Sequence, residues 1–173
     1  KKKKKNRIIL AIPNPIISAG MASVLQQHFS DKVLTVTGIA DLRRTCYEYE
    51  DAVVVLCSQL GGAATVEHWR RLKRRHSDLK LIVWGRNQED ILGFQCGISV
   101  VDGYLLESCD SSYLVQAIRS LKQGNVYVAA PVAAYLAQNP RSQRQKSMVD
   151  MLSERELQVA QMLSRGIRVR EIA

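Results

Sequence analysis

The stretch "AVVVLC", residues 52–57, decides the fold class of this 173-residue chain. It contains no charged residue and three valines in succession, a pattern typical of a strand that is buried on both faces. Strands of this kind lie in the middle of parallel sheets whose two faces are covered by helices. The stretch therefore predicts an α/β domain.

The segments on either side of this strand alternate in the same way. Further runs at residues 8–12, 33–38, 79–84 and 103–106 predict four more strands. Helical periodicity predicts helices at residues 16–29, 40–49, 64–76, 88–96 and 111–123. Strands and helices that alternate in this way predict a five-stranded, parallel, doubly wound α/β domain over residues 6–123.

The composition changes after this domain. Residues 124–150 predict a short helix at 131–138, with Pro131 in its first turn, followed by the polar linker "NPRSQRQKSMVD" at 139–150. In "LSERELQVAQMLSRG", residues 152–166, Ser153 and Glu156 have the spacing of a capping box, and Gly166 is a typical helix stop. A second helix begins in "VREIA", so residues 151–173 predict the start of an incomplete, all-α helix-turn-helix.

Charge and composition narrow the function classes. The net charge is +9, of which residues 1–5, a basic tail, supply five, so the remainder permits nucleic-acid binding without requiring it. The four cysteines have neither metal-binding nor disulfide spacing, and we expect reduced thiols, no metal and no cofactor. No apolar run approaches a membrane span or a signal peptide, so we expect a cytoplasmic protein with no membrane partner.

The C-terminal segment carries a family resemblance. "LSERELQVAQMLSRGIRVREIA" is similar to the signature L-[TS]-x-R-E-x-x-V…L…G…x-E-I-A of NarL/FixJ response regulators, which have a LuxR-type helix-turn-helix. "GYLLES" at 103–108, "LVQAIRSLKQGNVYVAAPVAAYL" at 114–136 and "PNPIISAGMASVL", with Pro15 and Gly20 in register, resemble the receiver domain of that family. The resemblance implies a flavodoxin-like receiver with strand order 2-1-3-4-5, followed by a DNA-binding domain.

The resemblance also implies a phosphorylation site, and the chain departs from it at each position. Family receivers bind Mg²⁺ with two acids after the first strand and phosphorylate an aspartate that ends the third. They also use a hydroxyl after the fourth strand and a lysine after the fifth. The corresponding positions here form a degenerate phosphosite and are Ile12, Pro13, Leu56 (or Cys57 in the neighbouring register), Trp84 (or Gly85) and Glu107.

These replacements remove the chemistry of the site. Mg²⁺ prefers oxygen ligands, and neither Ile12 nor Leu56 carries a side-chain oxygen, while Cys57 is a soft ligand. Asp51 precedes Leu56 by five residues, about 16 Å along a strand, and Asp102 also lies at the wrong strand end. We therefore expect a pseudo-receiver without phosphorylation, in which apolar side chains fill the site in preference to a small ligand.

Three further features have two interpretations each. The segment "EHWRRLKRRH", residues 67–76, is either the solvated face of a helix or an anion-binding patch, and the solvated face is favoured. Cys57 is either a redox switch or an inert buried thiol, and the inert thiol is favoured. Arg165, Arg168 and Arg170 either contact the DNA backbone or lie in solvent, with neither favoured.

The leading hypothesis is a non-enzymatic transcription regulator that binds DNA and acts without aspartate phosphorylation. Its receiver would form homodimers or dock a protein partner, through the helices at 16–29 and 111–123. One alternative is a regulator controlled by a small molecule in the former phosphosite. Another is a protein-binding adaptor or anti-activator that does not bind DNA, if the chain ends at Ala173.

Overall fold

The computed structural model describes residues 7–60, 62–87, 90 and 100–138, all within the first of two compact units of the chain, residues 1–138. The second unit, residues 139–173, contains the predicted linker and helix-turn-helix and lies outside the described residues. The same is true of the basic tail and of most of the helix predicted at 88–96.

The described residues form a six-stranded parallel sheet with the order β2-β1-β3-β4-β5-β6. Its strands are β1 (Arg7–Ala11), β2 (Lys32–Val36), β3 (Val53–Cys57), β4 (Lys80–Gly85), β5 (Gly103–Leu106) and β6 (Tyr127–Val128). All five residues of β3 are buried, and β3 lies between β1 and β4. The apolar stretch at residues 52–57 therefore marks a central strand, as predicted.

The number of strands differs from the prediction of five. Tyr127 and Val128, which fall in the segment predicted as a short helix and linker, form β6 beside β5. The Tyr127 amide donates to the Asp102 carbonyl at 2.9 Å, and the Ala129 amide donates to the Tyr104 carbonyl at 3.1 Å. A strand of two residues is too short to show an alternating pattern, so only its pairing with β5 reveals it.

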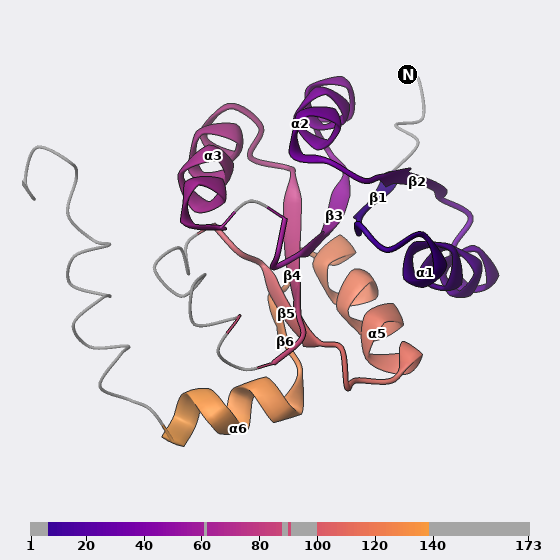
Figure 1. The fold of residues 1–173 in the computed structure, drawn as a ribbon, viewed down its shortest axis with the longest axis vertical. Helices are drawn as coiled ribbons and strands as arrows, with labels where there is room; N and C mark the ends of the chain where they lie inside the picture. Colours follow the sequence, from indigo (N-terminus) through magenta and orange to yellow (C-terminus); the bar gives the residue numbers. More distant parts are fainter. Residues whose placement is uncertain (1–6, 61, 88–89, 91–99, 139–173) are drawn as a thin grey trace, which may run out of the picture. The chain divides into compact units, whose positions relative to one another are not determined.

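Two layers of helices cover the sheet (Figure 1). The helices are α1 (Pro15–His28), α2 (Ile39–Glu48), α3 (Gly62–Arg75), α5 (Ser111–Lys122) and α6 (Ala130–Gln138). Figure 1 shows α1 and α5 on one face of the sheet and α2 and α3 on the other. The short helix predicted at 131–138 corresponds to α6. None of the described helices is long and apolar enough to span a bilayer.

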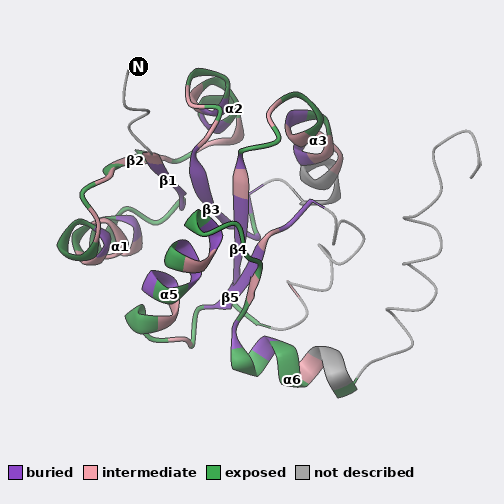
Figure 2. Ribbon diagram, turned by 180° about the vertical axis from the view of Figure 1, so that it is seen from behind, coloured by how far each residue is buried: buried purple, intermediate pink, exposed green. Residues whose placement is uncertain are grey.

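The core lies between these layers, and Figure 2 shows the buried strands in the centre with mixed burial along the helices. On α3, the predicted inner side chains Trp69 and Leu72 are each 1% exposed. On α5, apolar residues three and four apart face the sheet, including Leu114, Ile118 and Leu121. The sheet thus forms a rigid platform, and the residues that follow its strands line one edge.

Candidate functional site

The carboxyl edge of the sheet brings together the residues of the predicted phosphosite. Parallel pairing places Ala11 at the end of β1 beside Leu56 in β3. It also places Cys57 beside Trp84, and Gly85 beside Leu106. Ile12 and Pro13 directly follow β1, and Glu107 directly follows β5. The six predicted positions therefore follow or end four neighbouring strands at one edge.

Apolar side chains occupy the part of this edge between β1 and β3. Ile12, Leu56 and Cys57 are 1%, 0% and 4% exposed, whereas Pro13 is exposed. The Asn14 side chain, which also follows β1, accepts hydrogen bonds from the Ile16 and Ile17 amides at the start of α1. This part of the edge consequently consists of buried apolar side chains and of the Asn14 side chain, whose oxygen already accepts hydrogen bonds from α1.

A polar cluster at the ends of β3 and β4 was not predicted from the sequence. The buried Ser58 hydroxyl donates to Asp90 Oδ2 at 3.2 Å, and the Arg86 amide donates to the same oxygen at 3.2 Å. Arg86 Nε lies 3.9 Å from this oxygen, so the carboxylate also has a cationic neighbour. Asp90 is therefore an acid near the carboxyl edge, held by donors from two strand ends.

The sequence contained one local signal for this cluster. Asn87 precedes Asp90 by three residues, and Asn87 Oδ1 accepts a hydrogen bond from the Asp90 amide at 2.9 Å. Asparagine accepts in this way from an amide three residues later when it caps a helix. The capping pattern predicts the local turn, but it does not predict that the Asp90 carboxylate reaches Ser58.

The charged groups at this edge do not form a metal-binding set within the part of the chain that the structure describes. No group of three or more His, Cys, Asp or Glu side chains there is arranged to hold a metal ion. Asp102, considered above as a substitute acid, precedes β5 and accepts from Lys73 Nζ at 2.5 Å and from the Leu81 amide at 2.8 Å. It therefore lies at the amino end of its strand and is engaged there.

The thiol of Cys57 is held in its protonated form. Burial raises the pKa of Cys57 above its usual value, and the nearby carboxylates of Asp90 and Glu107 raise it further. A hydrogen bond from the Gln59 backbone and the charge of Arg86 oppose this rise without cancelling it. Because the thiolate is the reactive form of cysteine, the environment favours the inert interpretation of Cys57.

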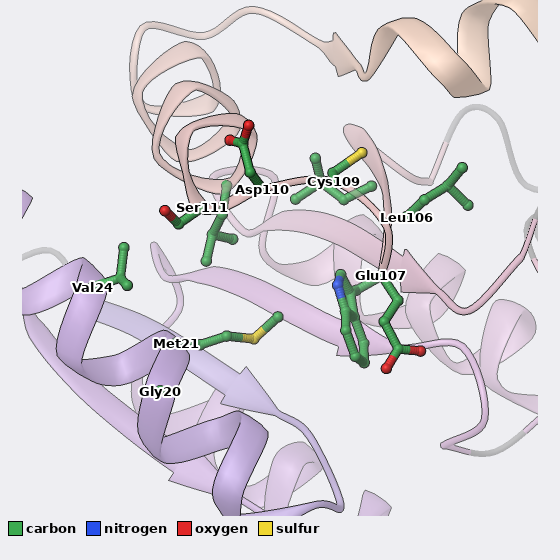
Figure 3. A pocket seen from close by; sticks show the side chains of 11 residues that line it. Gly20, Met21, Val24, Leu106, Glu107, Cys109, Asp110 and Ser111 are labelled. Atoms are coloured by element: carbon green, nitrogen blue, oxygen red, sulfur yellow. The ribbon is translucent and has the colours of Figure 1, made fainter.

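A pocket of about 210 Å³ lies beside the predicted phosphosite, between α1, the end of β5 and the start of α5 (Figure 3). Its lining residues are Gly20, Met21, Val24, Trp84, Leu105, Leu106, Glu107, Cys109, Asp110, Ser111 and Leu114. Figure 3 shows Met21 extending from α1 toward the strand end that carries Glu107. Trp84 and Glu107 thus line a pocket whose other walls do not include Ile12, Pro13 or Leu56.

The predicted phosphosite positions line two different parts of the carboxyl edge. Trp84 and Glu107 lie at the ends of β4 and β5, where α1 and α5 supply the opposing wall, while Ile12 and Leu56 pack between β1 and β3. One of the polar groups that line the pocket, the Asp110 carboxylate, already accepts a hydrogen bond from the Ser112 amide and thereby caps α5. Hydrogen bonds from the Ser112 hydroxyl and amide hold the pKa of Asp110 below its usual value.

The other predicted site residues remain predictions. Arg165, Arg168 and Arg170 lie in residues 139–173, outside the described part of the chain. The two helices predicted to form a dimer surface, α1 and α5, lie side by side on one face of the sheet (Figure 1). Lys122 at the end of α5 forms an ion pair of 2.5 Å with Asp31, which follows α1.

Comparisons with known proteins relate the chain to response regulators. It is 30% identical over 145 residues to the response regulator GacA of Pseudomonas aeruginosa, covering 81% of this chain and 68% of GacA. It is 27% identical over 168 residues to the response regulator UvrY of Escherichia coli K12, covering 96% of this chain and 77% of UvrY. No family profile matches the chain.

Solved structures resemble the chain in fold. A two-component response regulator of the LuxR family from Aurantimonas superposes with a TM-score of 0.67, at 21% identity, over 78% of this chain and 96% of that one. A structure of two RcsB dimers bound to two parallel DNAs superposes with a TM-score of 0.63, at 21% identity, over 99% of this chain and 82% of RcsB.

Proposed function

The chain belongs to the response regulators, and from this premise we propose that it is a DNA-binding transcription regulator of the LuxR type that acts without aspartate phosphorylation. DNA contacts would come from the complete C-terminal domain, and the receiver would act as a dimerisation or docking unit. The observation that carries the proposal is the apolar carboxyl edge, where Ile12 and Leu56 are fully buried and lack side-chain oxygens.

The interpretation as a DNA-binding regulator rests on residues 152–173. Their match to the LuxR-type signature includes the helix-capping Ser153 and the Glu171-Ile172-Ala173 end. The similarity to UvrY extends over 96% of the chain and so reaches this segment. The RcsB assembly of similar fold consists of dimers on DNA, which supports the same arrangement here.

The chemistry at the carboxyl edge supports action without phosphorylation. Mg²⁺ and a phosphoryl group need carboxylate oxygens and a nearby cation. Glu107 instead adds a negative charge after β5, and the Asp90 carboxylate accepts hydrogen bonds from Ser58 and Arg86. The packed side chains of Ile12 and Leu56 would hold this edge in one conformation.

This proposal is tested by phosphorylation in solution. The chain is incubated with acetyl phosphate and Mg²⁺ and examined by intact mass spectrometry, beside a receiver that accepts phosphate from this donor. We expect no phosphorylated species of this chain and no Mg²⁺-dependent change in its melting temperature. An adduct that is removed by hydroxylamine, and so is an acyl phosphate, would contradict the proposal.

DNA contacts are tested separately from phosphorylation. Gln replacements of Arg165, Arg168 and Arg170 in the full-length protein remove the proposed phosphate contacts. Each contacting arginine should reduce the dependence of log affinity on log salt by about one unit, with similar losses on all DNA sequences. Lys32→Gln, at an exposed position on β2 outside the two proposed dimer helices, serves as control for loss of charge alone. Equal effects of the control would argue against contacts by these arginines.

Dimerisation through α1 and α5 has its own test. Ile16 on α1 is 83% exposed, an unusual position for a large apolar side chain. Ile16→Glu should shift the sedimentation equilibrium toward monomer if α1 lies in the dimer interface. Val126→Glu, at a position 74% exposed outside both helices, is the matched control. A dimer that is unaffected by Ile16→Glu would exclude this part of α1 from the interface.

Control by a small ligand is the second candidate, and the pocket beside Trp84 and Glu107 is the observation in its favour. Its volume of about 210 Å³ is below the range of about 300–1,000 Å³ that is usual for ligand sites. A thermal-shift screen with metabolites distinguishes the candidates. A ligand whose stabilisation is lost in Met21→Trp, which would fill the pocket, would favour the ligand-controlled regulator.

A further inference from the structure

A groove between α2 and α3 gathers positive charge on the face of the sheet opposite α1 and α5. We call it the α2–α3 groove, and its lining residues are Arg43, Tyr47, His68, Arg71, Leu72, Arg74 and Arg75. Figures 1 and 2 both show α2 and α3 as neighbours on this face. The groove has a volume of about 640 Å³ and contains four arginines and no acid among its lining residues.

The spacing of these residues along each helix places their side chains on the helix faces that line the groove. Arg43 and Tyr47 are four residues apart on α2, and residues three or four apart share one helix face. On α3, His68 is followed at intervals of three and four residues by Arg71 and Arg75. This second row extends over about 10 Å of helix.

Most of this charge lacks an internal partner. Among the described residues, the side chains of Arg43, Arg74 and Arg75 are exposed and form no hydrogen bond or ion pair. Arg71 is paired, with Glu67 at 3.4 Å. Like charges that converge in a concave surface repel each other, so a bound anion would stabilise the groove.

The pKa of His68 is affected by cations on both helices of the groove. Burial lowers the pKa of His68, and the charges of Arg43 on α2 and Arg71 on α3 lower it further. Its Nε2 atom is buried and has no hydrogen-bond partner within the described part of the chain. Burial, and to a smaller extent the two arginines, favours the neutral imidazole, so the cations of the groove are guanidinium groups.

The chemistry of guanidinium groups selects phosphate. Arginine presents planar, forked donors that match the oxygens of phosphate, and it stays charged at all relevant pH values. Tyr47 adds an aromatic ring that is 46% exposed and contacts His76 edge-on, at 5.7 Å between ring centroids. Aromatic rings of this kind stack on nucleobases.

Carboxylates border the groove and favour a compact ligand. Glu67 contacts Arg70 at 2.9 Å and Arg71 at 3.4 Å, beside the row on α3. Glu50 Oε1 lies 3.4 Å from Nδ1 of His76, the ring that contacts Tyr47. The phosphates of an extended nucleic acid would come close to these carboxylates and be repelled by them. A small molecule with several phosphates would fit between the carboxylates.

We propose that the α2–α3 groove binds a nucleoside di- or triphosphate, with the phosphates on the arginines and the base on Tyr47. The lining of the site includes no residue of the carboxyl edge of the sheet. It does not depend on how the chain regulates transcription.

The test measures binding of GTP, ATP and pyrophosphate to the full-length chain by calorimetry at about 0.15 M salt, where exposed charges are largely screened beyond ~8 Å. Arg43→Gln/Arg75→Gln should weaken all three ligands at least tenfold. Tyr47→Leu should weaken the nucleotides at least threefold and leave pyrophosphate unchanged. Arg44→Gln/Arg119→Gln removes the same charge outside the groove lining and should change none of them.

Several results would overturn the proposal. Absence of nucleotide binding would do so, as would equal weakening by the groove variant and the control variant. If a single-stranded oligonucleotide bound through Arg43 and Arg75 while the nucleotides did not, the groove would be a nucleic-acid site instead. Circular dichroism checks the fold of each variant, and Arg74→Gln provides a second groove variant, since Arg74 is exposed.

Discussion

Single residues in this protein owe their chemistry to burial. Cys46 on α2 is fully buried, and burial raises the pKa of its thiol to about 12. Cys57 is affected in the same direction at the carboxyl edge. Ile12 and Leu56, at the same edge, place hydrocarbon where the resemblance to receivers implies carboxylates. At this scale, burial favours unreactive forms of the two thiols.

The raised pKa of Cys46 predicts a stability that depends on pH. Above about pH 9 the thiol of the unfolded chain loses its proton, while the folded chain keeps it up to about pH 12. The unfolded state then binds fewer protons, so the free energy of unfolding falls as the pH rises through this window, by up to ~1.4 kcal/mol per unit. Urea unfolding of the wild type and of Cys46→Ala between pH 7 and 11 measures this contribution.

The comparison of the two proteins isolates the thiol from other groups that titrate in the same window. The difference in unfolding free energy between wild type and Cys46→Ala should be constant from pH 7 to 8.5 and should shrink above pH 9. A difference that stays constant up to pH 11 would show that the Cys46 thiol ionises as easily in the folded state as in the unfolded state.

Individual elements depend on local signals at their ends. The Asn14 side chain caps α1 by accepting from the Ile16 and Ile17 amides at 3.0 and 3.3 Å, and Pro15 occupies the first helical position. Proline suits this position because its missing N–H would have no partner there. The stretch after β1 therefore acts as a helix start, and α1 begins two residues after Pro13.

The cap predicts a measurable loss. Asn14→Ala removes the acceptor for two amides and should lower the free energy of unfolding by about 1 kcal/mol. Asn14→Ser keeps a side-chain acceptor and should retain most of the stability. Chemical denaturation measures both, and equal stability of all three proteins would mean that water replaces the cap without cost.

The end of α5 depends on glycine. Gly124 has φ of +85°, the left-handed region, and its amide donates to the Leu121 carbonyl at 3.0 Å. A Cβ at this position would have open space, so the cost of Gly124→Ala comes from backbone conformation alone. We expect a loss of about 1 kcal/mol in unfolding free energy. Gly20→Ala, inside α1 with open space around it, should instead be neutral or stabilising.

At the scale of the described domain, ion pairs connect segments that are distant in the sequence. Asp102 links three elements, because it accepts from Lys73 on α3 and from the Leu81 amide in β4 while it precedes β5. The side chains of Lys73 and Asp102 are only 16% and 15% exposed. Lys122 and Asp31 similarly connect α5 to the segment after α1.

The position of Asp102 predicts a larger effect than a surface pair. Asp102→Ala leaves both the Lys73 ammonium and the Leu81 amide without this partner and should cost about 2 kcal/mol. Asp41→Ala removes an exposed pair with Arg44 and should cost under about 0.5 kcal/mol. Urea denaturation distinguishes the two, and equal losses would show that solvent screens Asp102 as fully as Asp41.

Local pattern was enough to predict most of the architecture. The apolar run at 52–57 and the alternation of strand and helix patterns correspond to the central strand β3 and to the elements around it. The strand order 2-1-3-4-5, which the family resemblance implied, is the order of β1 to β5 in the sheet. Trp69 and Leu72 are buried as their helical spacing predicted. The apolar run, the alternation and the helical spacing are local or periodic features, so they can be recognised from neighbouring residues. β6 was missed because two residues carry no period.

The sequence by itself determined the class of fold, the family resemblance and the residue types at the strand ends, because each depends on identity and spacing along the chain. Only the tertiary structure decided which groups meet. It placed Asp90 against Ser58, put Trp84 and Glu107 in a pocket that Ile12 and Leu56 do not line, and set Arg43 of α2 in one groove with the arginines of α3. Such contacts join residues that are tens of positions apart, and their geometry follows from how helices pack on a sheet.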